Sequence, residues 1–215
     1  MKLYDWLDRR YALQPLLVKN VTGKKVPKHL SWAACFGGLA FFTFLVQVFT
    51  GALLMMYYKP HPDQAFDSVM YIKSNVPMGW LIQRIHAVSA NVMIALVLMH
   101  MARVAYKRIF RAPRELHWVT GVFLFVLTLF MAFTGYLLPW TQLSYWGAKV
   151  GTEILSAVPF IGEDLVNWVR RGHGISGDTL GFFYACHVAI LPGIVGLFLV
   201  GHFFMIRRTG ISEPL

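Results

Sequence analysis

The segment "LIQRIHAVSANVMIALVLMHMARV", residues 81–104, is apolar enough to lie in lipid, yet it carries His86 and His100. An ionisable side chain at membrane depth is costly and usually functional. A helix rises about 1.5 Å and turns about 100° per residue, so the spacing of these histidines puts them on one face, about 21 Å apart. A helix over this segment therefore presents one imidazole near each surface of the membrane.

Four apolar segments are long enough to cross a bilayer core, which takes about 20 helical residues. They cover residues 32–58, 80–106, 118–138 and 181–206, and we name them spans A to D. Of the 215 residues, 57% are hydrophobic and only 14% are charged, which argues against a nucleic-acid partner despite the net charge of +10. We therefore expect an all-α membrane protein, a four-helix transmembrane bundle that forms a single domain over residues 1–215.

The positive charge indicates how the spans are oriented. Fourteen lysines and arginines lie on the side of the two termini, and five lie on the side of the A–B and C–D connections. Cytoplasmic loops carry the excess of basic residues, so both termini are expected on the cytoplasmic or stromal (n) side, with these connections on the opposite (p) side. In the C–D connection, "PFIGEDLVNWVRRG" predicts an amphipathic helix on the p surface, with Arg170 and Arg171 in its last turn and Gly172 ending it.

Span D repeats the arrangement of span B, because His187 and His202 are also separated by about four turns of helix. Spans B and D run in the same direction, which places His86 level with His187 near the p side and His100 level with His202 near the n side. Two facing imidazoles are the ligand set of a six-coordinate haem, whereas zinc or copper sites need three or four ligands. We therefore predict two bis-histidine b haems, held between spans B and D.

Glycines on the other two spans share this period. Gly37 and Gly51 on span A, and Gly121 and Gly135 on span C, fall at the same two levels. Glycine lets a flat group approach a backbone closely, although small residues in spans also serve helix packing. Three cations border the two levels and are candidates for binding the haem propionates: Arg84, Arg103 and Arg207. The alternative is that these side chains simply extend to the membrane surface.

The motifs "PRELHWVTGV", "GYLLPWTQLSYWGAKV" and "TLGFFYACHVAILP", with the histidine pairs and glycines, resemble the cytochrome b family. The resemblance covers nearly the whole chain and is to the short, split form found in b-six/f-type quinol–plastocyanin or quinol–cytochrome c oxidoreductases. It implies a di-haem electron-transfer subunit of an enzyme complex, not catalytic alone. That complex passes electrons from quinol oxidation at the p side to quinone reduction at the n side, a Q cycle coupled to proton translocation.

The resemblance also implies further cofactors and partners. In the split family, a cysteine at the position of Cys35 carries a covalent c-type haem; the alternative is a packing residue. The quinol-oxidation pocket falls on Tyr136, Gly147, Ala148 and Val150, for which surface packing is the alternative. The implied partners are subunit IV, a Rieske iron–sulfur protein, a c-type cytochrome and lipid quinone, in a dimeric complex.

Some positions depart from the plant-type pattern: Gln83, Ala87, Thr141 and Phe182. They cluster near the predicted p-side haem and leave its propionate contacts open. They also favour a bacterial relative that uses menaquinol in a plasma membrane, with a thylakoid membrane as the alternative. Two alternatives come from other classes, a di-haem anchor of a dehydrogenase or hydrogenase and a small transporter with histidine proton relays. The "PWTQLSYWGAK" loop argues against a mere anchor, and a transporter would hold no haem.

Overall fold

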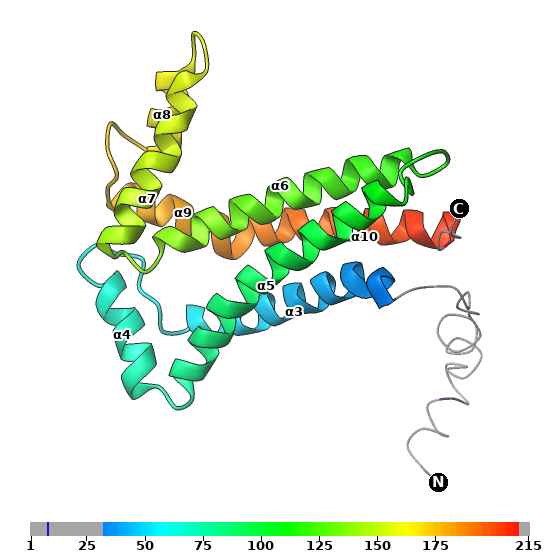
Figure 1. Cartoon of the computed structure of the whole chain (residues 1–215). Coiled ribbons are helices and arrows are strands. Elements are labelled where there is room, and N and C mark those ends of the chain that lie inside the picture. Colours follow the sequence, from blue (N-terminus) through cyan, green and yellow to red (C-terminus); the bar gives the residue numbers. More distant parts are fainter. Residues whose placement is uncertain (1–7, 9–31, 211–215) are drawn as a thin grey trace.

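A computed structural model describes Asp8 and residues 32–210 of the chain. Within that part, four helical segments are long and apolar enough to cross a membrane: Trp32–Met55, Gly79–Tyr106, Glu115–Leu137 and Gly177–Thr209. They run side by side in one bundle (Figure 1), which confirms the predicted four-span, all-α architecture. Most of their large apolar side chains are exposed, as expected of helices whose solvent is lipid.

The bundle consists of two helix pairs. Helix α3 (Phe36–Met55) packs along α5 (Gly79–Tyr106), and α10 (Leu191–Thr209) packs along α6 (Glu115–Leu137). Gln47 links the first pair across the membrane core, because its side-chain amide donates to the His86 carbonyl at 2.8 Å and to the Ser89 hydroxyl at 2.9 Å. Interhelical hydrogen bonds of this kind hold membrane helices together where burial of apolar surface gives little gain.

The boundaries of the spans differ from the predictions by a few residues. Span A starts with a short 3₁₀ turn (Trp32–Cys35) and its helix ends at Met55, while α6 begins three residues before the predicted Trp118. Span D is not a regular helix throughout. It consists of α9 (Gly177–Ala185), a π-helical turn (Cys186–Ile190) and then α10, and this turn contains His187.

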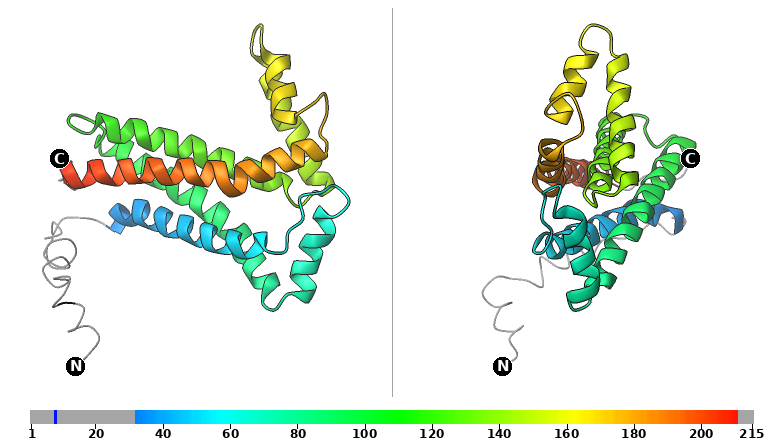
Figure 2. Two further views of the ribbon diagram at one scale, coloured as in Figure 1. Left: turned by 180° about the vertical axis from the view of Figure 1, so that it is seen from behind. Right: turned by 90° about the vertical axis from the view of Figure 1, so that its left-hand side faces the viewer.

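The A–B and C–D connections, which were predicted on the p side, are more structured than the sequence indicated. Helix α4 (Ala65–Asn75) lies in the A–B connection, and α7 (Gln142–Glu153) precedes the predicted loop helix, α8 (Gly162–Arg170). Helices α7 and α8 form a hairpin that projects from one end of the bundle (Figure 2). The chain leaves α8 through Arg171 in the left-handed region, at φ 61°, so the prediction that Gly172 ends this helix was off by one residue.

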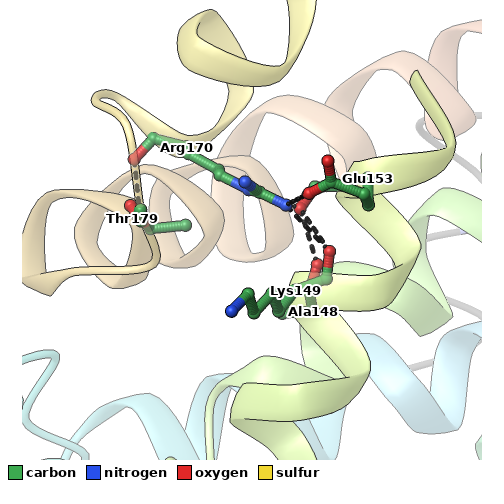
Figure 3. Close-up of polar contacts among 7 residues, drawn as sticks. Ala148, Lys149, Glu153, Arg170 and Thr179 are labelled. Atoms are coloured by element: carbon green, nitrogen blue, oxygen red, sulfur yellow. Dashed lines mark hydrogen bonds and ion pairs between the residues drawn. The ribbon is translucent and has the colours of Figure 1, made fainter. Parts of the chain in front are cut away.

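A buried arginine fastens this hairpin. Arg170 lies in the last turn of the helix predicted on the membrane surface, yet it is only 5% exposed. Its guanidinium donates to Glu153 at 2.7 Å, to the Thr152 hydroxyl at 2.8 Å and to the Lys149 carbonyl at 2.9 Å (Figure 3). Its own carbonyl accepts from the Thr179 hydroxyl at 2.5 Å, so one residue joins α7, α8 and the start of span D.

The hydrophobic core of the described residues gathers at this same end of the bundle. It comprises Ala65, Leu137, Ala148, Ile175, Leu180 and Phe183. Tyr58, just after α3, closes the core by donating its hydroxyl to the Leu138 carbonyl at 2.7 Å. Burial, with a smaller contribution from Tyr184, raises the pKa of Tyr58, so its phenol stays protonated and keeps this bond. This end of the bundle, predicted to face the p side, is thus a packed platform beneath the first histidine level.

The basic N-terminal stretch, residues 1–31, lies outside the described residues except for Asp8. Seven of the fourteen lysines and arginines counted on the side of the termini are in that stretch. The described ends of α3 and α10 that lie nearest the termini are on the same side of the bundle, together with the connection between α5 and α6 (Figure 1). That arrangement is the one that four consecutive spans require.

Candidate haem centre

The histidine level at the platform end joins the two helix pairs. His86 comes from α5 and His187 from the π-helical turn before α10, and their ring centroids are 6.3 Å apart with planes at 78°. Two metal–nitrogen bonds of about 2.0 Å, plus the distance from each ring centre to its nitrogen, add up to roughly this separation. The spacing therefore fits one metal ion between the two imidazoles.

Hydrogen bonds fix which nitrogen of each ring is free. The Thr50 hydroxyl donates to the Val46 carbonyl at 2.6 Å, so its oxygen accepts from His86 Nδ1–H at 2.8 Å. His187 Nδ1 lies 3.0 Å from the Met131 carbonyl, which only accepts, so this nitrogen also carries the proton. Both rings are left with an unprotonated Nε2, which is the nitrogen that a haem iron requires.

The second histidine level borders a cavity of about 570 Å³ at the opposite end of the bundle. His100 and His202 both line it, with Gly37, Gly121 and Cys35. The Thr120 hydroxyl donates to backbone carbonyls within its own helix and accepts from His202 Nδ1–H at 2.9 Å. His202 is therefore in the same tautomer as the two histidines at the p level.

Each predicted glycine faces the imidazole of its own level. A Cβ atom at Gly135 would lie 2.5 Å from His187 Cε1, and one at Gly51 would lie 3.2 Å from His86 Cε1. At Gly37 the distance to His100 Cε1 would be 2.9 Å, and at Gly121 the distance to His202 Cε1 would be 3.8 Å. Three of the four glycines therefore give space to a histidine ring. From the sequence, that space was expected to admit the flat cofactor itself.

A short motif behind this geometry escaped the sequence argument. Three of the glycines follow a threonine, and in each case that threonine bonds the histidine that the glycine faces: Thr50-Gly51, Thr120-Gly121 and Thr134-Gly135. In each dipeptide the threonine holds the ring, and at Gly51 and Gly135 the glycine that follows also makes room for it. At Gly121 a Cβ would make only an ordinary contact, so the threonine alone acts on His202 there. Gly37 instead follows Phe36, and His100 Nδ1 is buried without a partner among the described residues.

The predicted cations are divided between cavity and surface. Arg103 lines the n-side cavity, whereas Arg84 on α5 and Arg207 in the last turn of α10 are exposed and do not line it. Cys35 ends the 3₁₀ turn before α3 and borders the same cavity. Two further residues that the sequence argument did not assign, Arg114 and His117, also line it.

The four residues assigned to quinol oxidation are not all placed alike. Tyr136 and Gly147 are in contact, since a Cβ at Gly147 would lie 2.8 Å from Tyr136 Cε1. Ala148 is buried in the hydrophobic core, and Val150 is 64% exposed on α7. The structure thus brings two of the four together, and the other two lie on opposite faces of the same helix.

The departures from the plant-type pattern have structural partners. Thr141 caps α7 by accepting from the Ser144 backbone N–H at 3.1 Å. Phe182 packs on Trp168 and receives the Arg171 guanidinium 5.4 Å from its ring centre. Gln83 is half-buried and Ala87 is exposed, both on α5 close to His86.

Taken together, the donors and the space fit haem. Each level offers two imidazoles from different helix pairs, and three of the four are held with Nε2 free by a fixed Nδ1–H. No group of three or more His, Cys, Asp and Glu side chains converges as a metal site among residues 32–210. Two imidazoles per level would hold a haem iron, a metal that brings its remaining donors with its own macrocycle.

Comparison with known proteins gives a consistent result. A family model described as cytochrome b/b6/petB matches residues 21–210. Cytochrome b6 of Synechococcus sp. (strain JA-3-3Ab) is 44% identical over 214 residues, covering 100% of this chain and 99% of that protein, and cytochrome b6 of Porphyra purpurea matches to the same extent. A solved chain of a hyperthermophilic respiratory Complex III superimposes with a TM-score of 0.93 at 38% identity, covering 99% of this chain. The chain spans only 56% of the length of that solved protein.

Proposed function

The chain belongs to the cytochrome b family, and we propose that it is the di-haem electron-transfer subunit of a quinol–cytochrome c or quinol–plastocyanin oxidoreductase. In this role it carries electrons across the membrane, from quinol oxidation at the p side to quinone reduction at the n side, coupled to proton translocation. Its full-length match to cytochrome b6, and its match to about half of the longer Complex III chain, support a split subunit that works within a larger complex.

Two b haems are bound in this proposal, one by His86 and His187 and the other by His100 and His202. Haem iron supplies one-electron redox chemistry at each level. The chain's own part is to hold Nε2 in place for three of the four ligands: Thr50 accepts from Nδ1–H of His86, Thr120 from that of His202, and the Met131 carbonyl from that of His187. These hydrogen bonds prevent the rings from turning and make each imidazole a stronger ligand.

The distance between the two levels gives the function its energetic scale. Levels about 21 Å apart span roughly two thirds of a 30 Å core. Moving one electron between them therefore costs or yields about 1.5 kcal/mol for each 100 mV of membrane potential. The fourteen-residue period on α5 is what turns electron transfer into charge movement across the membrane.

A third, covalently attached c-type haem is proposed at Cys35, because this thiol borders the n-side cavity beside Gly37. At the p side, the contact between Tyr136 and Gly147 supports a quinol pocket on that face. The proposed partners are subunit IV, a Rieske protein and a c-type cytochrome, with both termini on the n side. A bacterial membrane and menaquinol remain the favoured setting.

The observation that carries the proposal is the pair of histidine levels, each joining the two helix pairs. The test uses two samples of the purified complex, one with its Rieske partner reduced and one with it oxidised. Quinol is then added to each, and reduction of the b haems is followed. With the n-side quinone site blocked by an inhibitor, we expect oxidation of the Rieske partner to be required for rapid reduction of the b haems, since quinol gives one electron to each. Equal haem reduction with the Rieske protein kept reduced, or absent, would instead fit a membrane anchor.

A further inference from the structure

The n-side cavity contains a third histidine that the haem assignment does not use. His117 lies in the first turn of α6, and its ring centroid is 6.2 Å from that of His202, with the planes at 69°. It lines the same cavity as His100 and Cys35. The His117 side chain is half-buried, and a buried ring nitrogen is expected to have a hydrogen-bond partner.

Hydrogen bonding indicates which nitrogen of His117 carries the proton. The Thr209 hydroxyl has a single hydrogen, which it donates to the Met205 carbonyl at 3.2 Å. Its oxygen therefore accepts at the 3.2 Å contact with His117, and Nε2 is the protonated nitrogen. Nδ1 is left with a lone pair. It is buried and has no hydrogen-bond partner in the described part of the chain, so neither arginine of the cavity lining donates to it.

An unprotonated Nδ1 restricts the ligands that suit it. It accepts a hydrogen bond, so the ionised propionates of a haem, which also only accept, do not match it. Coordination to a haem iron through Nδ1 is disfavoured, because the Cβ atom on the adjacent ring carbon would press against the macrocycle. A ligand hydroxyl remains, and a quinol carries two of them.

The rest of the cavity lining favours the same acceptor. The charged residues among the described lining are Arg103 and Arg114, and no aspartate or glutamate is among them. A quinol hydroxyl that enters there finds no carboxylate to accept its proton. Two buried ring nitrogens on this wall have no partner among the described residues, His100 Nδ1 and His117 Nδ1. His100 is a proposed iron ligand, so His117 Nδ1 is the one of the two outside the haem ligand set.

We propose that His117 Nδ1 accepts a hydrogen bond from a hydroxyl of a quinol bound in the n-side cavity, and thereby favours the reduced form of the ring. The inference rests on the proposed n-side quinone site and assigns a residue to it. His117 would contact substrate directly, close to the n-side haem but outside its ligand set.

The test compares a quinol with its dimethyl ether, which keeps the ring and both oxygens, lacks hydrogen-bond donors and carries two more methyl groups. Trimethylhydroquinone and its dimethyl ether are titrated separately into the dithionite-reduced, purified complex, and binding is followed through the absorbance shift of the n-side haem. The variants are His117→Phe, which keeps a ring without nitrogens, and His117→Asn, whose side-chain oxygen takes roughly the place of Nδ1. His117→Gln is the matched control, because its amide extends toward Thr209 as Nε2 does.

We expect the wild type to prefer the quinol over the ether by about three- to tenfold, the effect of one hydrogen bond. His117→Phe and His117→Gln should lose that preference, and His117→Asn should keep most of it. If His117→Phe loses the n-side haem, the comparison of Asn with Gln decides the matter.

Other outcomes overturn the inference in distinguishable ways. No shift with either probe in the wild type would remove the n-side quinone site and the role of His117 with it. A wild-type preference that survives in both Phe and Gln would leave the site and reject the residue. Unchanged binding together with a changed midpoint potential of the n-side haem would show that His117 contacts the haem carboxylates instead.

Discussion

The contact between Gly135 and His187 gives the sharpest prediction about haem binding. Replacing Gly135 with alanine puts a Cβ atom 2.5 Å from His187 Cε1, and ordinary contact begins only at 3.4 Å. The ring must therefore move by about 0.9 Å. It is not free to do so, because Nδ1 is bonded to the Met131 carbonyl at 3.0 Å and to Thr134 at 3.2 Å.

The size of the effect follows from these contacts. Overpacking a well-filled site costs about 1–3 kcal/mol. Weakening the hydrogen bonds of Nδ1 adds about 1 kcal/mol, so the p-side site should lose roughly 2–4 kcal/mol of haem affinity. At about 1.4 kcal/mol per tenfold, the affinity of the p-side site for haem falls by a factor of roughly 30 to 1,000, so its occupancy falls when haem is limiting.

Gly121→Ala is the matched control on the same helix. Gly121 also follows a threonine, but a Cβ there would lie 3.8 Å from His202 Cε1, an ordinary contact. Both substitutions gain the same helix propensity, so that contribution cancels. Haem-to-protein ratios by pyridine haemochrome, with a redox titration to separate the two levels, should show loss of the p-side haem in Gly135→Ala only. Full occupancy with an unchanged potential in Gly135→Ala, or equal losses in both variants, would refute imidazole clearance as the role of these glycines.

Three further predictions concern other parts of the molecule. Thr120→Val removes the acceptor for His202 Nδ1–H, so the imidazole becomes a weaker electron donor to the iron and the midpoint potential of the n-side haem should rise, with that of the p-side haem unchanged. A spectroelectrochemical titration checks this, and equal shifts at both levels would contradict it. Cys35→Ala should abolish haem peroxidase staining of the 24.5 kDa band in denaturing gels and spare both b haems, and an unstained wild-type band with the mass of the bare polypeptide would make Cys35 a packing residue. Arg170→Met should lower the free energy of opening the α7–α8 hairpin by about 2–4 kcal/mol, and amide hydrogen exchange should become faster in residues 142–170 but not in α3. Equal protection in the variant and the wild type would show that the buried arginine does not hold the hairpin.

Much of the fold is accessible from the sequence because lipid restricts the choices. Apolar segments of this length have to form helices, and the fourteen-residue period on α5 is enough by itself to identify the two histidine levels. The matched glycines follow from the same period, although their neighbour is a histidine ring at three positions. The family resemblance identifies the chain's relatives correctly.

Other features depend on contacts between distant residues and have no local signal. The partners of Arg170 come from α7, and burial turns a residue that looks like a surface cation into the link between two loop helices. The π-helical turn at His187 and helix α4 are set by packing at the platform end, where periodicity is short and ambiguous. The role proposed for His117 could not be predicted from the sequence, because it depends on contacts with His202 and Thr209, which lie more than eighty residues away in the chain.

The central claim is that each histidine level holds one b haem. The most direct measurement is the haem content and redox titration of the purified complex, for the wild type and for His202→Leu. We expect two b haems per chain, titrating in two steps in the wild type, and loss of the n-side step alone in the variant. Two unchanged steps in His202→Leu, or fewer than two b haems in the wild type, would contradict the assignment.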